Sequence, residues 1–291
     1  MAPASAITRR RFFAALAGLG AAGVGGAAYM RWFESDWFEV SRRRIDFGRW
    51  PGVPPVRVLH LSDLHASGPV PLPMLRRAIE LGLAERPDLI LLTGDFWTDR
   101  YASGDDLAAL LAALPAHAPT YAVVGNHDGG GWARLAGGYP TLEPAAHLLA
   151  AANIRWLHNA AEEVTVANRP VQLVGVGDFW AGDCEPEDAF RTLGATAGTG
   201  RPLRLVLNHN PDAKDLFGHL DWDLMLCGHT HGGQLRIPFT GGTPFAPVRD
   251  HRYVAGLNPW NDRQIFTTRG VGNLHGVRFN CRPEVSLLEV G

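Results

Sequence analysis

From residue 56 onward, short apolar runs alternate with amphipathic stretches along the chain. The apolar runs are rich in Val, Leu and Ile, which is typical of strands buried on both faces. They comprise Val56–Leu61, Leu89–Thr93, Thr120–Val124, Val171–Val176, Leu203–Leu207 and Leu224–Cys227, followed later by Gln264–Thr268 and Val285–Val290. Helical spacing of apolar residues predicts helices over Leu75–Glu85, Asp105–Leu114 and Glu143–Ala152. This alternation predicts one layered α/β domain over residues 37–291.

Composition narrows the class of protein. The chain has 291 residues, of which 46% are apolar and 19% are charged, so a sizeable core forms and wholesale disorder is excluded. The formal net charge of −2 argues against a general nucleic-acid binder, and we expect no nucleic-acid partner. The three cysteines are far apart and form no CxxC pair, which excludes a disulfide scaffold and a thiolate zinc ribbon.

The first 36 residues have the layout of an export signal. Arg9 and Arg10 precede Phe12, and the segment from Phe12 to Met30 holds no charged residue. The cationic motif resembles the twin-arginine translocation signal, which implies the twin-arginine export machinery as a partner. The apolar segment would reach roughly 28 Å as a helix, close to the hydrocarbon thickness of a bilayer. Residues 1–36 are therefore predicted to be a signal peptide or an N-terminal membrane anchor, and the protein is predicted to be periplasmic, extracytoplasmic or membrane-anchored.

Polar residues follow five of the predicted strands at the point where each strand ends. The carboxyl ends of strands in an α/β sheet are where ligands bind, so these side chains are expected to converge. The oxygen and imidazole groups suit paired Mn, Fe, Zn or Co ions, whereas calcium avoids imidazole. The candidate metal ligands are Asp63, His65, Asp95, Asn126, His209, His229 and His231.

These motifs, taken in order over residues 56–235, resemble the five motifs of the calcineurin-like metallophosphoesterases. The twin-arginine motif and the C-terminal sequence Arg269 to Glu284 resemble the secreted or membrane-attached bacterial phosphodiesterase branch of that superfamily. The resemblance implies a four-layer α/β/β/α sandwich. It also implies two divalent metal ions, for which Mn is the first choice and Fe, Zn or Co remain open.

The resemblance also implies a role for each motif residue. One ion would be held by Asp63, His65, Asp95 and His231. The other would be held by Asp95, Asn126, His209 and His229, with Asp95 bridging. His127 would lie beside the ions as a catalytic residue without binding them, and Asp128 would orient it.

The function that follows is hydrolysis of a phosphoester, most simply a phosphodiester of lipid or cell-envelope origin, by a metal-bound hydroxide. One alternative is a hydrolase of UDP-2,3-diacylglucosamine in lipid A synthesis. A second alternative is a non-catalytic, metal-stabilised binding module of the envelope.

Several residues outside the motifs have two interpretations. His60 lies within a predicted strand and is expected to be a hydrogen-bonded core histidine. The tryptophans Trp97, Trp132 and Trp180 either fill the core or form an apolar rim around the site. His251 and His275 either line the substrate cleft or are structural. Four arginines could bind a phosphate by paired guanidinium hydrogen bonds, namely Arg249, Arg252, Arg269 and Arg278.

Overall fold

The computed structural model describes residues 20, 23–48, 52–193 and 202–291. The Arg9-Arg10 motif and most of the predicted apolar segment lie outside these residues. Within the described part of the chain, no helix combines the length and the apolar character needed to cross a membrane.

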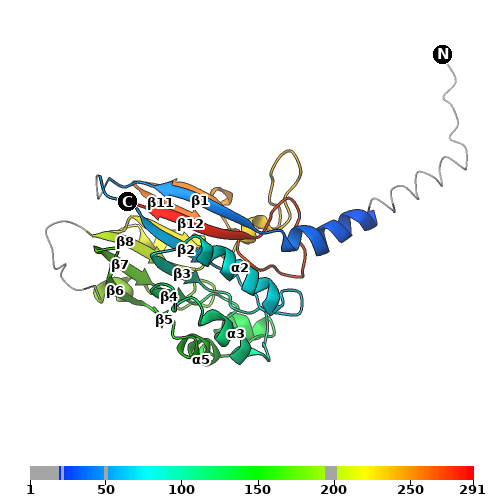
Figure 1. Ribbon diagram of the computed structural model, residues 1–291, viewed down its shortest axis with the longest axis horizontal. Coiled ribbons are helices and arrows are strands. Elements are labelled where there is room, and N and C mark those ends of the chain that lie inside the picture. The colour runs from blue at the N-terminus through cyan, green and yellow to red at the C-terminus, as the bar shows by residue number, and fades with distance from the viewer. Residues whose placement is uncertain (1–19, 21–22, 49–51, 194–201) are drawn as a thin grey trace, which may run out of the picture.

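Two six-stranded sheets form the centre of the fold (Figure 1). The first sheet has the order β1-β12-β2-β3-β4-β5, and the second has the order β10-β11-β9-β8-β7-β6. In the first sheet the neighbours from β2 to β5 are parallel, while β12 runs antiparallel to β2. In the second sheet β7, β8, β9 and β11 are parallel, and the edge strands β6 and β10 are antiparallel to their neighbours. The bounds are β1 Glu39–Ile45, β2 Val56–Leu61, β3 Leu89–Thr93, β4 Thr120–Val123, β5 Arg155–Trp156, β6 Ala160–Val166, β7 Arg169–Gly175, β8 Leu203–Leu207, β9 Leu224–Cys227, β10 Gly256–Trp260, β11 Arg263–Thr267 and β12 Glu284–Val290.

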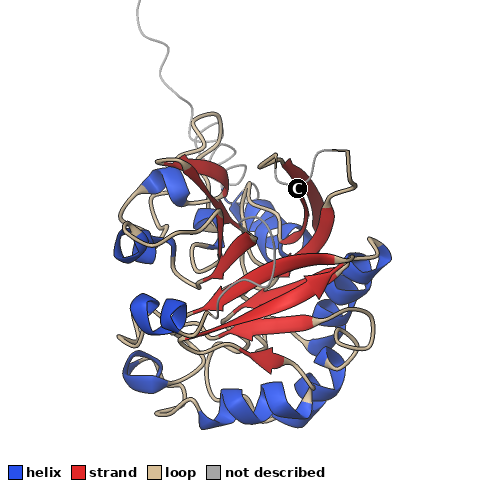
Figure 2. Cartoon of the chain, turned by 90° about the vertical axis from the view of Figure 1, so that its left-hand side faces the viewer, coloured by secondary structure: helices blue, strands red, loops and turns tan. Residues whose placement is uncertain are grey.

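Helices cover the outer faces of both sheets (Figure 2). The first sheet is covered by α2 (Leu72–Ala84), α3 (Gly104–Leu111) and α5 (Glu143–Ala151), which share one apolar cluster with it. The second sheet is covered by α6 (Pro186–Arg191) and the 3₁₀ segment η3 (Pro211–Phe217). A short helix, α4 (Gly130–Leu135), follows β4. The predicted four-layer α/β/β/α sandwich is confirmed.

Alternation along each strand divides the apolar side chains between the layers. Val58 and Leu91 face the second sheet and join a core between the two sheets, whereas Leu59 and Leu92 face the helices. This two-sided burial explains why the central strands are mainly apolar. It also explains why β2, β3, β8 and β9 have the predicted bounds.

The differences from prediction occur where the apolar pattern is weak. Helix α2 begins at Leu72, before the predicted start, because proline is tolerated in a first helical turn, here at Pro73. Strands β1, β5, β6 and β10 were not predicted as part of the sheets. They lie at or beside the sheet edges and carry mixed polar sequences, such as Glu-Val-Ser-Arg-Arg-Arg-Ile in β1.

The N-terminal segment packs against the C-terminal part of the domain. Residues 23–36 are helical and end in a π turn, η1 (Tyr29–Phe33), and a 3₁₀ turn, η2 (Glu34–Asp36). The backbone N–H of Arg278 donates to Met30 O at 3.2 Å, and the backbone N–H of Cys281 donates to the buried Glu34 carboxylate. Met30 and Glu34 are therefore tied to the segment that carries Arg278 and Cys281.

His60 has the role that its strand position predicts. Its side chain is fully buried, and Nε2 lies 2.8 Å from Thr93 Oγ1. Burial lowers the pKa of His60 to about 3. The unfolded chain, where histidine titrates near its usual pKa of about 6.5, therefore binds a proton that the folded chain excludes between these two values.

We expect the His60→Gln variant to lose part of the acid sensitivity of the wild-type protein. Between pH 6 and pH 4 the wild-type free energy of unfolding should fall by up to about 1.4 kcal/mol per pH unit through His60 alone. Glutamine can still reach Thr93 but does not titrate. The measurement is urea unfolding of metal-free protein at several pH values. The exposed His117→Gln variant is the control, and parallel pH profiles for wild-type and His60→Gln protein would contradict the expectation.

Candidate metal centre

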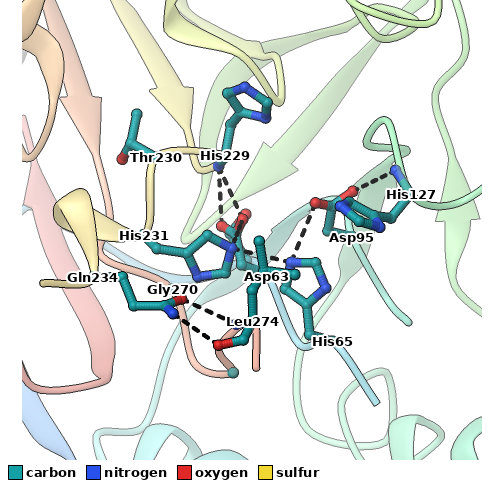
Figure 3. Close-up of polar contacts among 12 residues, drawn as sticks. Asp63, His65, Asp95, His127, His229, Thr230, His231, Gln234, Gly270 and Leu274 are labelled. Carbon is teal, nitrogen blue, oxygen red and sulfur yellow. Dashed lines mark hydrogen bonds and ion pairs between the residues drawn. The ribbon is translucent and has the colours of Figure 1, made fainter. Parts of the chain in front are cut away.

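The predicted ligands follow the carboxyl ends of strands in both sheets, and Figure 3 shows Asp63, His65, Asp95 and His231 close together there. Asp63 and His65 follow β2, Asp95 follows β3, and Asn126 follows β4. The second sheet contributes His209 after β8, and His229 and His231 after β9. All seven side chains are buried.

Asp95 connects the two predicted halves of the site. Its Oδ2 lies 3.3 Å from His65 Nε2 and 3.2 Å from His209 Nε2. Its Oδ1 accepts a hydrogen bond from the backbone N–H of His127 at 2.9 Å. One carboxylate thus touches an imidazole from each predicted ligand set, which is the placement that a bridging ligand needs.

The remaining imidazoles extend the cluster on both sides of Asp95. His231 Nε2 lies 3.0 Å from His65 Nε2 and 3.3 Å from Asp63 Oδ1. His229 Nδ1 lies 3.3 Å from His209 Nε2. The backbone N–H of His229 donates to both oxygens of Asp63, at 3.0 and 3.1 Å.

Hydrogen bonds fix which ring nitrogens face the cluster. A carbonyl only accepts, so the 2.6 Å contact to Thr93 O places a proton on His209 Nδ1 and leaves Nε2 as the ligand atom. The other ring nitrogen of His65, Nδ1, lies 3.2 Å from Thr98 Oγ1. This second-partner arrangement is typical of metal-binding histidines.

Two features show that the donors fit cations. The Nε2 atoms of His65 and His231 face each other at 3.0 Å, where two lone pairs require a proton or a cation between them. The Oδ1 atom of Asn126 is buried without a hydrogen-bond partner, which is costly unless an unseen group binds it. Oxygen and imidazole donors of this kind suit Mn, Fe, Zn or Co.

The charges of the cluster are strongly coupled. Burial opposes ionisation of Asp95, but His209 and His127 hold its pKa well below the usual range. Burial likewise opposes protonation of His209, yet Asp95 raises its pKa well above the usual range. Burial lowers the pKa of His229 and His231, which stay neutral. Cation binding at His209 Nε2 must therefore displace a proton, and metal affinity should rise with pH.

The backbone around these ligands is held in an unfavourable conformation. Five predicted ligands have left-handed φ values, namely Asp63 (54°), His65 (48°), Asp95 (57°), His229 (68°) and His231 (50°). For a residue other than glycine this costs roughly 1–3 kcal/mol, and such strain concentrates at functional sites. Glycine is required beside them, because a methyl group on Gly228 would overlap the Asp63 carboxylate.

The structure corrects the predicted partner of His127. Its Nδ1–H donates to the carbonyl of Thr98 at 2.7 Å, so Thr98 orients the ring. The prediction that Asp128 orients His127 is wrong, because the Asp128 carboxylate accepts from the backbone N–H groups of Asp95, Phe96 and Gly125 at 2.7 to 2.8 Å. Burial and the Asp95 charge raise the pKa of Asp128 to about 8, and the backbone donors oppose that rise. Asp128 therefore holds the loops that carry Asp95 and Asn126 together.

Two of the three tryptophans form a rim around the cluster. The ring of Trp180 lies 4.3 Å from that of His229, and the ring of Trp132 lies 4.6 Å from that of His127. The two indoles are 5.9 Å apart. Trp97 is buried in the core beside Tyr139.

Three of the four candidate arginines have polar partners within the fold. Arg278 is fully buried and donates to backbone carbonyls that include Gly272, Arg269 and His231. Arg269 pairs with Glu284, Arg252 pairs with Asp250, and Arg249 lies over the ring of Phe179. The prediction that Arg278 could bind a phosphate is wrong, because this buried guanidinium supports the loop that carries His231 instead. His251 is exposed and contacts Thr243.

Asp178 is a further acidic residue near the cluster that the motif pattern did not single out. It is fully buried after β7, its Oδ1 accepts from the backbone N–H of Ala181 at 2.8 Å, and its Oδ2 has no partner. Burial raises its pKa to about 6, and His209 opposes that rise. The signal was present in the sequence, because Gly177-Asp178 follows a buried strand as Gly94-Asp95 does.

Comparisons with known proteins point to one family. The family described as calcineurin-like phosphoesterase matches residues 56–233, which include all seven predicted ligands. The chain is similar to phosphodiesterase YaeI of Escherichia coli, with 46% identity over 98% of this chain and 99% of that protein. It is also similar to an uncharacterized metallophosphoesterase, YkuE of Bacillus subtilis, with 28% identity over 97% and 96% of the two chains. UDP-2,3-diacylglucosamine pyrophosphatase LpxG of Chlamydia muridarum is 25% identical over 80% of this chain and 83% of its own.

We expect Asp95→Asn to weaken both halves of the site at once. The amide removes the charge that faces His65 and His209, so bound metal should fall from about two ions per chain towards one or none, and turnover should fall at least 100-fold. Elemental analysis of purified protein measures the first quantity. The exposed Asp262→Asn variant is the control. Two retained ions with full turnover would remove Asp95 from the bridging position.

Proposed function

The chain belongs to the calcineurin-like phosphoesterase family, whose members hydrolyse phosphoester bonds, and we propose that it acts as a phosphodiesterase on a substrate of the cell envelope. The observation that carries the proposal is the position of the Asp95 carboxylate between His65 Nε2 and His209 Nε2. This position lets Asp95 belong both to the ligand set that contains His65 and to the ligand set that contains His209. The same donors and the family favour an enzyme over a non-catalytic binding module.

Two divalent cations, when bound, supply positive charge that polarises a phosphoester and activates water near neutral pH. Asp63, His65, Asp95 and His231 would hold one cation, and Asp95, Asn126, His209 and His229 the other. Mn is our first choice of metal, with Fe, Zn or Co as the alternatives. The chain's own contribution is to fix these donors by buried hydrogen bonds.

His127 is placed to handle a proton beside the cluster. Because Nδ1–H is committed to Thr98 O, the exchangeable position is Nε2. The ring lies between His65 and Trp132, at centroid distances of 4.9 and 4.6 Å. Burial lowers the pKa of His127, although the Asp95 charge opposes this, so a proton held on Nε2 would be given up readily to the leaving oxygen of the ester.

The surroundings of the site favour a diester over a monoester. A dianionic monoester calls for additional cationic side chains, and three of the candidate arginines, Arg252, Arg269 and Arg278, already bind carboxylates or backbone carbonyls. Trp132 and Trp180 instead offer apolar ring surface to a second organic substituent. A second candidate, hydrolysis of UDP-2,3-diacylglucosamine, is supported by the name of the chlamydial relative.

Phosphodiesterase activity is tested on bis(4-nitrophenyl) phosphate with protein stripped of metal and reloaded with each candidate ion. We expect turnover only after reloading and a higher kcat/KM than on 4-nitrophenyl phosphate. Equal or better hydrolysis of the monoester would contradict the diester assignment.

The role of His127 is separated from a structural role by the leaving group. Nitrophenolate departs without a proton, whereas an alkoxide needs one. We expect His127→Gln to retain its metal, to lose about 10²–10⁴-fold on a dialkyl phosphodiester, and to lose much less on the nitrophenyl ester. Equal losses on both esters with intact metal content would exclude the acid role.

We propose that the protein is exported through the twin-arginine machinery and works in the periplasm or at the membrane, held there by its N-terminal segment if that segment is retained. Support comes from the Arg9-Arg10 motif and the uncharged segment that follows it. Changing both arginines to lysine conserves the charge, so it should retain the protein in the cytoplasm only if the twin-arginine machinery recognises the pair. Cell fractionation measures this, and unchanged export would indicate another route.

A further inference from the structure

A mainly apolar pocket of about 390 Å³ adjoins the metal cluster. One wall is formed by residues 230–235 without Gly232, and this wall includes the predicted ligand His231. The opposite wall is formed by Leu274, His275 and Val277, and Phe245 and Pro247 complete the pocket. A molecule seated here therefore has one end beside the cluster.

The two walls are fastened to each other (Figure 3). The side-chain amide of Gln234 donates to Leu274 O at 2.7 Å and accepts from Leu274 N at 3.0 Å. Residues 234 and 236 also exchange backbone hydrogen bonds with Phe279, at 3.0 and 2.9 Å. The pocket is thus held open before any ligand binds, which reduces the ordering cost of binding.

The polar groups of these walls are already used within the fold. Both ends of the Gln234 amide bind Leu274, and Thr230 Oγ1 donates to Val254 O at 2.7 Å. Apart from the two histidines, the rest of the lining is mainly aliphatic or aromatic. A nucleobase or sugar would find few donors or acceptors there, whereas a hydrocarbon requires none.

The N-terminal segment packs behind the second wall. Ser35 Oγ donates to Gly276 O at 3.3 Å, and Arg278 N donates to Met30 O. The side chain of Trp32 in this segment is 75% exposed, and those of Tyr29, Phe33 and Trp37 are also exposed. Figure 1 shows it leaving the end of the molecule where the 274–279 loop lies. Exposed aromatic residues of this kind suit the interface between water and lipid, so apolar molecules would concentrate at this end.

We propose that this pocket binds the linear hydrocarbon tail of an amphiphilic phosphoester, with the phosphate at the cluster. The proposal rests on the proposed function for the position of the phosphate. The pocket volume of about 390 Å³ is within the range of small-molecule sites. The preferred substrates are thus phosphodiesters with at least one alkyl or acyl chain, and the pocket is the part of the chain that selects them.

The proposal is tested with 4-nitrophenyl esters of methyl, butyl and octyl phosphate, each kept below its micelle-forming concentration. Wild-type, Mn-loaded protein should show a kcat/KM that rises along the series by up to roughly fourfold for each methylene that enters the pocket. Burial of only two to three methylenes would then give an octyl-to-methyl ratio of about 30, which is the minimum that we expect.

Two variants change the pocket in different ways. Val277→Asp introduces a charge, and Val277→Phe fills space while staying apolar. Both should lower the octyl-to-methyl ratio at least about fourfold, the cost of keeping one methylene in water. Leu216→Asp is the matched control, because Leu216 is a 40% exposed leucine on η3, outside the pocket. It should leave the ratio unchanged.

Binding of octylphosphonate and methylphosphonate, measured by calorimetry, separates this inference from the proposed function. If the wild-type protein hydrolyses all esters with a flat ratio and binds both phosphonates equally, the tail pocket is overturned and the phosphodiesterase stands. If no ester is hydrolysed but octylphosphonate binds more tightly and Val277→Asp removes the difference, the pocket stands and the phosphodiesterase falls. A thymidine 4-nitrophenyl ester that exceeds the octyl ester and is sensitive to Val277→Asp would make this a nucleobase pocket and overturn the proposal.

Discussion

The burial of two carboxylates among imidazoles is the constraint around which this structure is organised. Asp63 and Asp95 are at most 2% exposed, so their charge must be compensated by neighbouring groups rather than by water. Backbone N–H groups of His229 and His127 supply part of that compensation, and imidazoles supply more. The left-handed backbone at both aspartates is the conformational cost of turning them inward. Cations complete the balance, which ties the stability of these loops to metal binding.

Neither sheet could build this site alone. The first sheet contributes both carboxylates and His65, whereas His209, His229 and His231 come from the second sheet. The apolar core between the sheets fixes their separation, because leucines and valines from both sheets fill it. Repacking that core would therefore shift ligands relative to each other by distances that matter at a metal site. Fold stability and site geometry depend on the same side chains.

The parts of this structure that the sequence predicted are those with a local signal. Strands β3 and β9 are almost continuous apolar runs, and each is followed by residues that the cluster uses. The ligand atoms and their partners were not accessible in that way. Thr98 rather than Asp128 orients His127, and Arg278 supports His231 instead of binding phosphate. The sequence did not predict either contact, because each joins segments that are far apart in the chain. The pocket wall likewise depends on Gln234 meeting Leu274, which only the tertiary fold determines.

The position of β12 has a consequence for how the protein is made. This strand is the last in the chain, yet it lies between β1 and β2 and pairs with both. During synthesis β1 therefore has no neighbour in its sheet until residues 284–290 have left the ribosome. The hydrogen bond from Cys281 N–H to the Glu34 carboxylate likewise forms only after residue 281 has been made. Contacts of such sequence separation form slowly. The edge of the first sheet at β1 is therefore completed late, after β2, β3 and β4 are already available to pair with one another.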